Sequence, residues 1–396
     1  MENWFKNKAK LQGNPFTPSG TGLPNGNYVY LSARMEGKVT KFYDELSTGR
    51  GAKTFPLIGN YGAGKSAFMK GFMTDFFWKK KIKAFYIENP GVNFYSIANH
   101  VLQSLGRYEF SKALYEISEH YLSTQQVLFG SNYDAFLISL KTKSDRDVMI
   151  IKLQKILKDK VQLTNNENVA YSFAKLVIET KIRPFFDYKD FVSEGTSPSV
   201  PKDLEAEYFN ALITAIKGIY GAEGVALLLD EFEELTLGAR ISSRVRYEYL
   251  STFRKLIDES EHQNLWIVLA MVPGVEKIIE KINPPLWERF SHHGETTLSL
   301  EELDRDEITG IIEKWLNSMR TGSESKSIFP FERGIEDVFL SRSQLRFPRV
   351  VVKVCFQTLA RASSENIDPP ISKEYVSKIA EEFYPKRSEK KISEES

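Results

Sequence analysis

The sequence predicts an α/β fold in which helices flank a five-stranded parallel sheet, with an all-helical domain after it. Strand-like and helix-like apolar runs alternate as far as Leu300, and only helix-like runs follow. One strand-like run, Val225 to Leu229, is apolar at every position. Such a strand is buried on both faces, which is typical of a parallel sheet.

The elements of the sheet domain follow from these runs and from the turn residues between them. Strands are expected at Phe55 to Ile58, Ile82 to Ile87, Val225 to Leu229, Leu265 to Val272 and Thr296 to Leu300. Helices are expected at Leu31 to Leu46, Ala67 to Trp78, Phe94 to Leu105, Ala206 to Tyr220, Arg244 to Asp258 and Val275 to Ile282. We therefore expect one domain over residues 31–300.

Three segments fall outside this alternation. Residues 1–30 are rich in Gly, Pro and Asn, and we expect an extended N-terminal arm there. Residues 108–202 show helical spacing without strands, which predicts a large helical insertion between two strands of the sheet. Residues 386–396 are charged and almost free of large apolar side chains, which predicts a disordered tail.

The predicted helical domain covers residues 301–385. Asp304 is suited to cap its first helix, because Glu307 three residues later completes a capping box. Further helices are expected at Phe331 to Leu340, Pro348 to Ala362 and Ser372 to Phe383. Proline suits the first turn of the helix at Pro348, and Cys355 within that helix is expected in the core.

Composition excludes several classes of protein. The net charge of +1 provides no overall attraction to nucleic acid or membranes, although a local patch could still bind them. The single cysteine excludes an internal disulfide and a Cys-rich zinc site, and we interpret His292-His293 as a solvated turn. No stretch approaches the roughly 18 apolar residues of a membrane span. We therefore expect a cytoplasmic protein that has no membrane partner.

The most specific motif runs from Gly59 to Ser66 and fits G-x-x-x-x-G-K-[ST] at every fixed position. A strand-like run precedes it and a helix-like run follows, which is the context that this pattern requires. The glycines let backbone N–H groups point at one phosphate, while Lys65 would reach the β- and γ-phosphates and the Ser66 hydroxyl would ligate Mg²⁺. The motif predicts a site for ATP and Mg²⁺ formed by Gly59, Asn60, Tyr61, Gly62, Ala63, Gly64, Lys65, Ser66 and Ala67.

A second motif, Asp230-Glu231, follows the apolar strand that ends at Leu229. Ligands of parallel α/β sheets bind at the carboxyl ends of the strands. Asp230 is suited to hold Mg²⁺ through water, and Glu231 is suited to polarise an attacking water. Glu233 and Glu234 come next, and we interpret them as surface charge.

With these two motifs the chain resembles the AAA+ ATPases, in the branch of origin-recognition and initiator ATPases. The resemblance covers most of residues 14–383 outside the insertion. Asn14-Pro15-Phe16, followed by Leu31-Ser32-Ala33-Arg34, is similar to the N-terminal segment that packs near the adenine in that family. The stretches Gly221 to Glu233 and Pro273 to Glu276 also resemble ATP-binding proteins of bacterial BREX-type phage defence.

The resemblance implies roles for two arginines. Pro284 to Phe290 is similar to the segment that carries the arginine finger, which implies that Arg289 acts on the ATP of a neighbouring subunit in a homo-oligomer. Gln344 to Arg349 resembles the start of the sensor 2 helix, with Arg349 the best match and Arg346 the alternative. The helical domain then corresponds to the lid of the family.

Two departures limit what the resemblance implies. The fourth strand ends in Leu269-Ala270-Met271-Val272, where the family usually places a polar sensor 1 residue. This predicts slow hydrolysis or a different group that orients the water. The residues after the expected lid are too few for the winged-helix domain of origin-type proteins, so DNA binding is not carried over from them.

Two functions stay open. The first is an ATPase that assembles into a ring or filament and uses ATP to drive or regulate assembly on DNA. Arg240, Arg244 and Arg246 could then touch the DNA backbone, or they simply form a charged helix start. The second is an ATP-gated switch or scaffold with little turnover that binds a protein partner through the insertion. A small-molecule kinase fits less well, because Glu231 beside Asp230 favours water as the acceptor.

Overall fold

The computed structural model describes residues 4–20, 22, 33–48, 52–91, 94–123, 132–180, 205–234, 241–260, 263–291, 296–321 and 328–385. The described residues form two compact units. The helical unit combines Met1–Val39, Ile58–Phe72 and Ser299–Ser396, and the sheet unit combines Thr40–Leu57 and Met73–Leu298. This division groups the glycine motif with the C-terminal helices. The domain limits derived from the sequence stay predictions.

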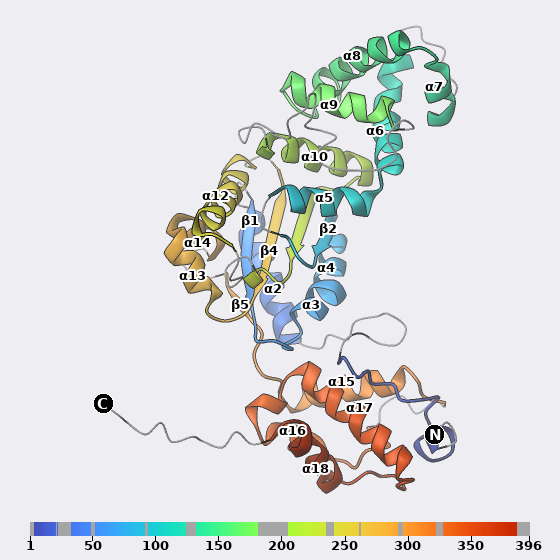
Figure 1. Cartoon of the computed structure of the whole chain (residues 1–396), viewed down its shortest axis with the longest axis vertical. Coiled ribbons are helices and arrows are strands. Elements are labelled where there is room, and N and C mark those ends of the chain that lie inside the picture. Colours follow the sequence, from blue (N-terminus) through green and yellow to red (C-terminus); the bar gives the residue numbers. More distant parts are fainter. Residues whose placement is uncertain are drawn as a thin grey trace. The chain divides into compact units, whose positions relative to one another are not determined.

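The described residues contain the predicted five-stranded, all-parallel sheet, which confirms the α/β class. Its strands lie in the order β2-β3-β4-β1-β5 (Figure 1). They are β1 (Lys53–Ile58), β2 (Ile82–Ile87), β3 (Gly224–Leu229), β4 (Leu265–Met271) and β5 (Leu298–Ser299). Because Leu229 pairs with Ile87 on one side and with Leu269 on the other, the carboxyl ends of β2, β3 and β4 meet at one edge.

Helices cover both faces of this sheet (Figure 1). Tyr43 stacks on Trp266 of β4 with ring centroids 4.8 Å apart, and Phe77 packs against the same indole at 5.6 Å. The helices that carry these two rings therefore cover the same part of the sheet. The helices around the strands are α2 (Ala33–Ser47), α4 (Thr74–Lys79), α5 (Phe94–Leu105), α10 (Glu205–Tyr220), α12 (Ser243–Glu259), α13 (Val275–Ile282) and α14 (Pro284–Ser291).

The described part of the predicted insertion consists of helices joined by short turns and loops (Figure 1). Its apolar core includes Tyr115 and Phe136, whose ring centroids are 4.5 Å apart, and the Tyr133 hydroxyl donates to the Val177 carbonyl at 2.5 Å. Residues 124–131 and 181–202 of the expected insertion lie outside the described residues. The helices are α6 (Arg107–Ser123), α7 (Tyr133–Ser139), α8 (Lys143–Asp159) and α9 (Glu167–Ile178).

The C-terminal part of the helical unit confirms the predicted capping box, because Asp304 and Glu307 each accept the backbone N–H of the other. Pro348 lies in the first turn of its helix and Cys355 is buried, also as predicted. The helix expected from Phe331 begins only at Glu336, since Phe331 instead pairs with Ile371 as an isolated bridge. The elements are α15 (Arg305–Asn317), α16 (Glu336–Leu340), η5 (Ser343–Leu345), α17 (Pro348–Ser364) and α18 (Lys373–Phe383).

The described part of the N-terminal segment is built into this helical core. Phe16 is buried and stacks on Trp315 with ring centroids 5.8 Å apart. The Trp4 indole donates to the Ile367 carbonyl at 2.7 Å, and the Asn14 amide donates to the Phe356 carbonyl at 3.0 Å. Residues 4–20 therefore complete an apolar core, and the adenine contact expected for this segment stays a prediction.

Candidate functional site

The glycine motif forms a tight loop between β1 and the helix α3 (Lys65–Phe68). Gly62 and Gly64 have φ angles of 81° and 96°, in the left-handed region where a side chain is strained. A Cβ atom placed on Gly59 would lie 3.1 Å from the Leu300 Cβ and 3.2 Å from the Ala63 Cβ. The loop therefore needs glycine at these positions for its curvature and for its close packing.

Lys65 points back into this loop. Its ammonium donates to the Gly59 carbonyl at 2.7 Å and to the Asn60 carbonyl at 3.5 Å, and the residue is buried. The ammonium also lies 5.7 Å from the centroid of the Tyr61 ring, which is 71% exposed. A buried cation inside a glycine-rich turn is a donor set that fits a phosphate group.

Arg349 lies against the same loop within the helical unit. Its backbone N–H donates to the Gly62 carbonyl at 3.3 Å, and a Cβ atom on Gly62 would lie 3.1 Å from the Arg349 Cβ. The N-terminal segment holds the arginine from the other side, because Arg349 Nε donates to the Ser19 carbonyl at 3.2 Å. The structure thus brings the predicted Arg349 to the predicted loop, and it adds Ser19, which the sequence did not indicate.

The alternative residue, Arg346, has different partners. Its Nε donates to the Leu303 carbonyl at 3.0 Å, and its Nη1 lies 2.8 Å from the Glu302 carboxylate. Arg346 therefore ties η5 to the segment before α15. Of the two sensor 2 candidates, only Arg349 has a contact with the glycine loop among those recorded for the described residues.

Asp230 is fixed at the carboxyl end of β3. It is buried, and its Oδ2 accepts a hydrogen bond of 2.7 Å from the Tyr86 hydroxyl on β2. Its Oδ1 accepts from the Glu231 N–H at 3.0 Å, and its own N–H donates to the Ile87 carbonyl at 2.9 Å. The carboxylate is thus held by the neighbouring strand. Tyr86 was missed in the sequence, although it lies one residue before the end of a predicted strand.

Glu231 has a left-handed backbone conformation and a raised side-chain pKa. Its φ of 54° is left-handed without the glycine that normally relieves this strain. Partial burial, followed by the charges of Asp230, Glu234, Glu88 and Glu233, raises the pKa of Glu231 above its ordinary value. A carboxylate with a raised pKa accepts a proton more readily, which is what a general base requires.

The end of the neighbouring strand β4 is apolar. Every residue of β4 is buried, and Val272 after it is buried as well. The Ala270 carbonyl accepts the Phe232 N–H at 3.1 Å, so this end of β4 lies directly beside the Asp230-Glu231 turn. The side chains at this end of β4 beside the turn are therefore apolar and buried.

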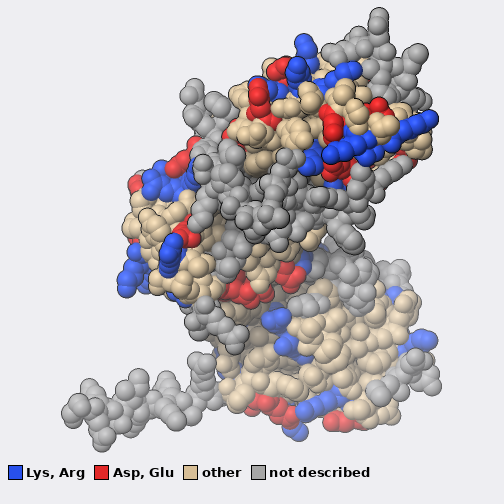
Figure 2. Space-filling model, turned by 45° about the horizontal axis from the view of Figure 1, so that its top comes forward, with Lys and Arg blue, Asp and Glu red and all other residues tan. Residues whose placement is uncertain are grey.

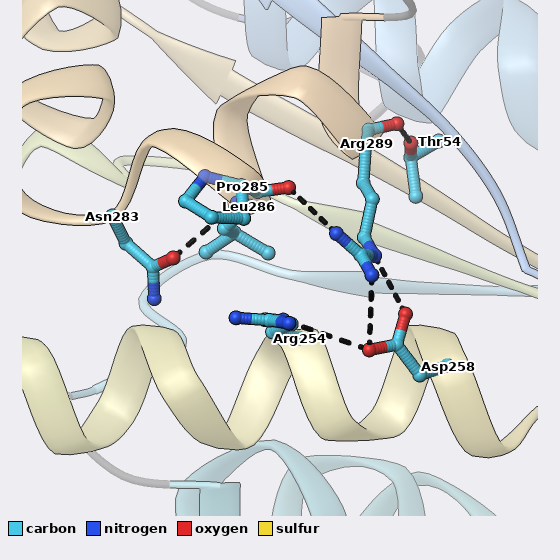
Figure 3. A network of polar contacts seen from close by, with 7 residues as sticks. All are labelled: Thr54, Arg254, Asp258, Asn283, Pro285, Leu286 and Arg289. Carbon is cyan, nitrogen blue, oxygen red and sulfur yellow. Dashed lines mark hydrogen bonds and ion pairs between the residues drawn. The ribbon is translucent and has the colours of Figure 1, made fainter.

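Arg289 is engaged within its own chain (Figure 3). Its Nε and Nη2 donate to the two carboxylate oxygens of Asp258 at 2.6 and 3.3 Å, and its Nη1 donates to the Pro285 carbonyl at 3.0 Å. Arg254 of the same helix as Asp258 lies 3.6 Å from that carboxylate. The side chain of Arg289 is 34% exposed. The sequence did not indicate this pairing, because 31 residues separate Arg289 from Asp258.

The remaining expectations concern partners. Arg244 pairs with Glu248 at 2.9 Å, whereas Arg240, His292, His293 and the tail 386–396 lie outside the described residues. On the described surface drawn in Figure 2, basic and acidic side chains are interspersed instead of forming one broad basic area. The described helices include none that is long and apolar enough to cross a membrane. Within the same residues, no group of three or more His, Cys, Asp or Glu side chains is arranged to hold a metal.

Comparison of the chain with known protein families, with curated proteins and with solved structures found no match. The site must therefore be judged on its own geometry.

Proposed function

We propose that this protein is an ATPase of the AAA+ type that binds ATP with Mg²⁺ and hydrolyses it at the interfaces of a homo-oligomer. The observation that carries the proposal is the glycine loop, in which Gly62 and Gly64 are left-handed and the buried Lys65 ammonium donates to the Gly59 carbonyl. This loop follows a buried strand and precedes a helix, which is the arrangement that phosphate binding requires.

In this proposal each residue of the site has a role in binding or hydrolysing ATP. Lys65 and the loop N–H groups would bind the phosphates, and Ser66 and Asp230 would hold the metal, Ser66 directly and Asp230 through water. A bound Mg²⁺ neutralises charge on the β- and γ-phosphate oxygens. Glu231 would take a proton from the attacking water, which its raised pKa supports. Arg349 would contribute a positive charge from the helix that already touches the loop.

The neighbour's contribution is tested with Arg289→Ala. An arginine supplied from a second subunit accelerates phosphoryl transfer by about 10³- to 10⁵-fold. We expect Arg289→Ala to lose hydrolysis by a factor in this range while ATP binding, measured by calorimetry, stays close to that of the wild type. Arg333→Ala, an exposed arginine of the helical unit, serves as the control. Hydrolysis at the wild-type rate in Arg289→Ala would contradict the proposal that Arg289 acts on the ATP of a neighbouring subunit.

We further propose that the assembly works on DNA. The test measures ATP hydrolysis and particle mass with no nucleic acid, with single-stranded DNA and with double-stranded DNA. We expect DNA to raise the rate in the oligomer, and we expect this gain to fall as salt rises, because phosphate contacts release counterions. A rate that is indifferent to both forms of DNA would contradict this part of the proposal.

The apolar end of β4 favours a second candidate function, an ATP-gated switch or scaffold that binds a protein partner through the insertion. Ala270 and Met271 are buried and offer no side-chain group that could orient a water. In this case ATP would stay intact for many minutes with the purified protein and Mg²⁺. Rapid turnover in the same assay would exclude the switch.

A further inference from the structure

Asp258 neutralises the arginine that the proposed function assigns to a neighbour's ATP. A guanidinium carries five N–H donors, and three of those of Arg289 are used by Asp258 and the Pro285 carbonyl. The Asp258 contacts are bidentate, which is the strong geometry for an arginine and a carboxylate. Arg289 is therefore held by a negative charge in the described chain, and it must leave that charge in order to act fully on a phosphate.

Asp258 has a second cation close by. Arg254 lies one helical turn before it on α12, with Nε 3.6 Å from Oδ2, which is the oxygen that Nη2 of Arg289 contacts at 3.3 Å (Figure 3). The three side chains are between 34% and 44% exposed, so each ion pair is weakened by water and is individually modest. The carboxylate can thus keep a partner when Arg289 departs.

The backbone of α14 is held independently of this ion pair. The Thr54 hydroxyl on β1 donates to the Arg289 carbonyl at 2.7 Å, and the Asn283 side chain accepts the Leu286 N–H at the start of the helix at 3.3 Å (Figure 3). The next residue, Phe290, is buried and packs on Phe253 with ring centroids 6.2 Å apart. The Arg289 side chain can therefore turn away from Asp258 while the helix stays in place.

We propose that Asp258 holds Arg289 in the unassembled subunit, and that Arg254 takes over the Asp258 carboxylate when Arg289 turns to the phosphates of a neighbour's ATP. This inference rests on the proposed function. Asp258 and Arg254 are positioning residues, because neither touches the nucleotide. The exchange makes the arginine available only where a more negative group, a triphosphate, competes with the carboxylate.

The test measures the protein concentration at half-maximal assembly, by particle mass with a slowly hydrolysed ATP analogue and by hydrolysis of ATP, without DNA. Asp258→Asn removes the holding charge, so we expect its midpoint to fall by about twofold to fivefold, the range that corresponds to an exposed ion pair. Arg254→Gln removes the replacement partner, so we expect its midpoint to rise by a similar factor. Glu248→Gln breaks another ion pair on the same helix, that with Arg244, and should leave the midpoint unchanged.

Opposite shifts separate the exchange from a merely structural role, in which both variants would weaken α14 and raise the midpoint together. Equal midpoints, or shifts in the same direction, would overturn the exchange. If Asp258→Asn does not fold, Arg254→Gln decides alone, and an unchanged or lower midpoint counts against the proposal. Wild-type hydrolysis in Arg289→Ala would instead contradict the proposed hydrolysis at subunit interfaces. A failure of the exchange and a failure of the proposed function can therefore be told apart.

Discussion

The glycine loop and the acidic turn after β3 both use left-handed backbone, but they do so with opposite kinds of residue. Gly62 and Gly64 have no side chain, and their φ angles of 81° and 96° cost little. Glu231 adopts a φ of 54° with a full side chain. Under the proposed function this difference is expected, because backbone N–H groups of the loop contact the phosphates, whereas after β3 the Glu231 side chain is needed and its strain is tolerated.

The contrast between the loop and the acidic turn would not hold if hydrolysis did not require the Glu231 side chain. Loss of a general base lowers rates by about 10²- to 10⁴-fold. We expect Glu231→Gln to lose hydrolysis by a factor in this range and to keep ATP binding, with phosphate release and calorimetry as the measurements. Glu280→Gln is the matched control, because Glu280 is exposed on α13 and is not one of the charges around Glu231. Similar rates in the two variants would contradict the assignment.

The role of the glycine loop is tested by Lys65→Ala, which should weaken ATP binding. A hydrogen bond to a charged group contributes about 1.5–3 kcal/mol. At about 1.4 kcal/mol per factor of ten, ATP should bind roughly tenfold to a hundredfold more weakly, as measured by calorimetry. The exposed Lys79 at the end of α4 supplies the control Lys79→Ala. Unchanged affinity in Lys65→Ala would show that the loop does not hold the nucleotide.

The two left-handed glycines can be compared with each other. An alanine in this region costs about 1–2 kcal/mol. A Cβ atom on Gly62 would also meet the Arg349 Cβ at 3.1 Å, whereas the nearest atom to one on Gly64 is the Pro348 Cγ at 3.6 Å, an ordinary contact. We therefore expect Gly62→Ala to lower the free energy of unfolding more than Gly64→Ala, in urea titrations without ATP. Equal losses would show that the Arg349 contact adds nothing to the strain.

The smallest effect concerns pH. The pKa of Glu231 is raised in the folded chain, so the folded state binds a proton more tightly than the unfolded state and becomes less stable as pH rises. Glu231→Gln should therefore melt at a slightly higher temperature than the wild type at pH 7. This difference should vanish below the ordinary glutamate pKa of about 4.3. A variant that melts lower at pH 7 would contradict the charge crowding around Glu231.

Short-range patterns predicted much of this architecture. The strand Ile82–Ile87 was predicted to the residue, because an apolar run ends there at a turn of Asn and Pro. The capping box of Asp304 and Glu307 was equally local. The helix expected from Phe331 was wrong at its start, because Phe331 pairs with Ile371. No window of the sequence around either residue contains that contact.

The candidate site shows the same limit. The loop Gly59–Ser66 and the pair Asp230-Glu231 are contiguous motifs, and their residues could be named in advance. The partners that hold Asp230 and Arg289 are Tyr86 and Asp258, which lie 144 and 31 residues away in the chain. Pairings of this kind depend on the order of strands and the packing of helices. Charge and hydropathy along the sequence carry no information about them.

The burial of the N-terminal segment has a consequence for synthesis of the protein. Trp4 donates its hydrogen bond to a carbonyl 363 positions later, and Phe16 stacks on Trp315. At the usual 5–20 residues per second, the ribosome needs roughly 20 to 70 s to make the chain between Trp4 and its acceptor. These aromatic side chains are therefore made long before their partners. Until the partners are made, Trp4 and Phe16 are open to any chaperone that binds exposed aromatic residues.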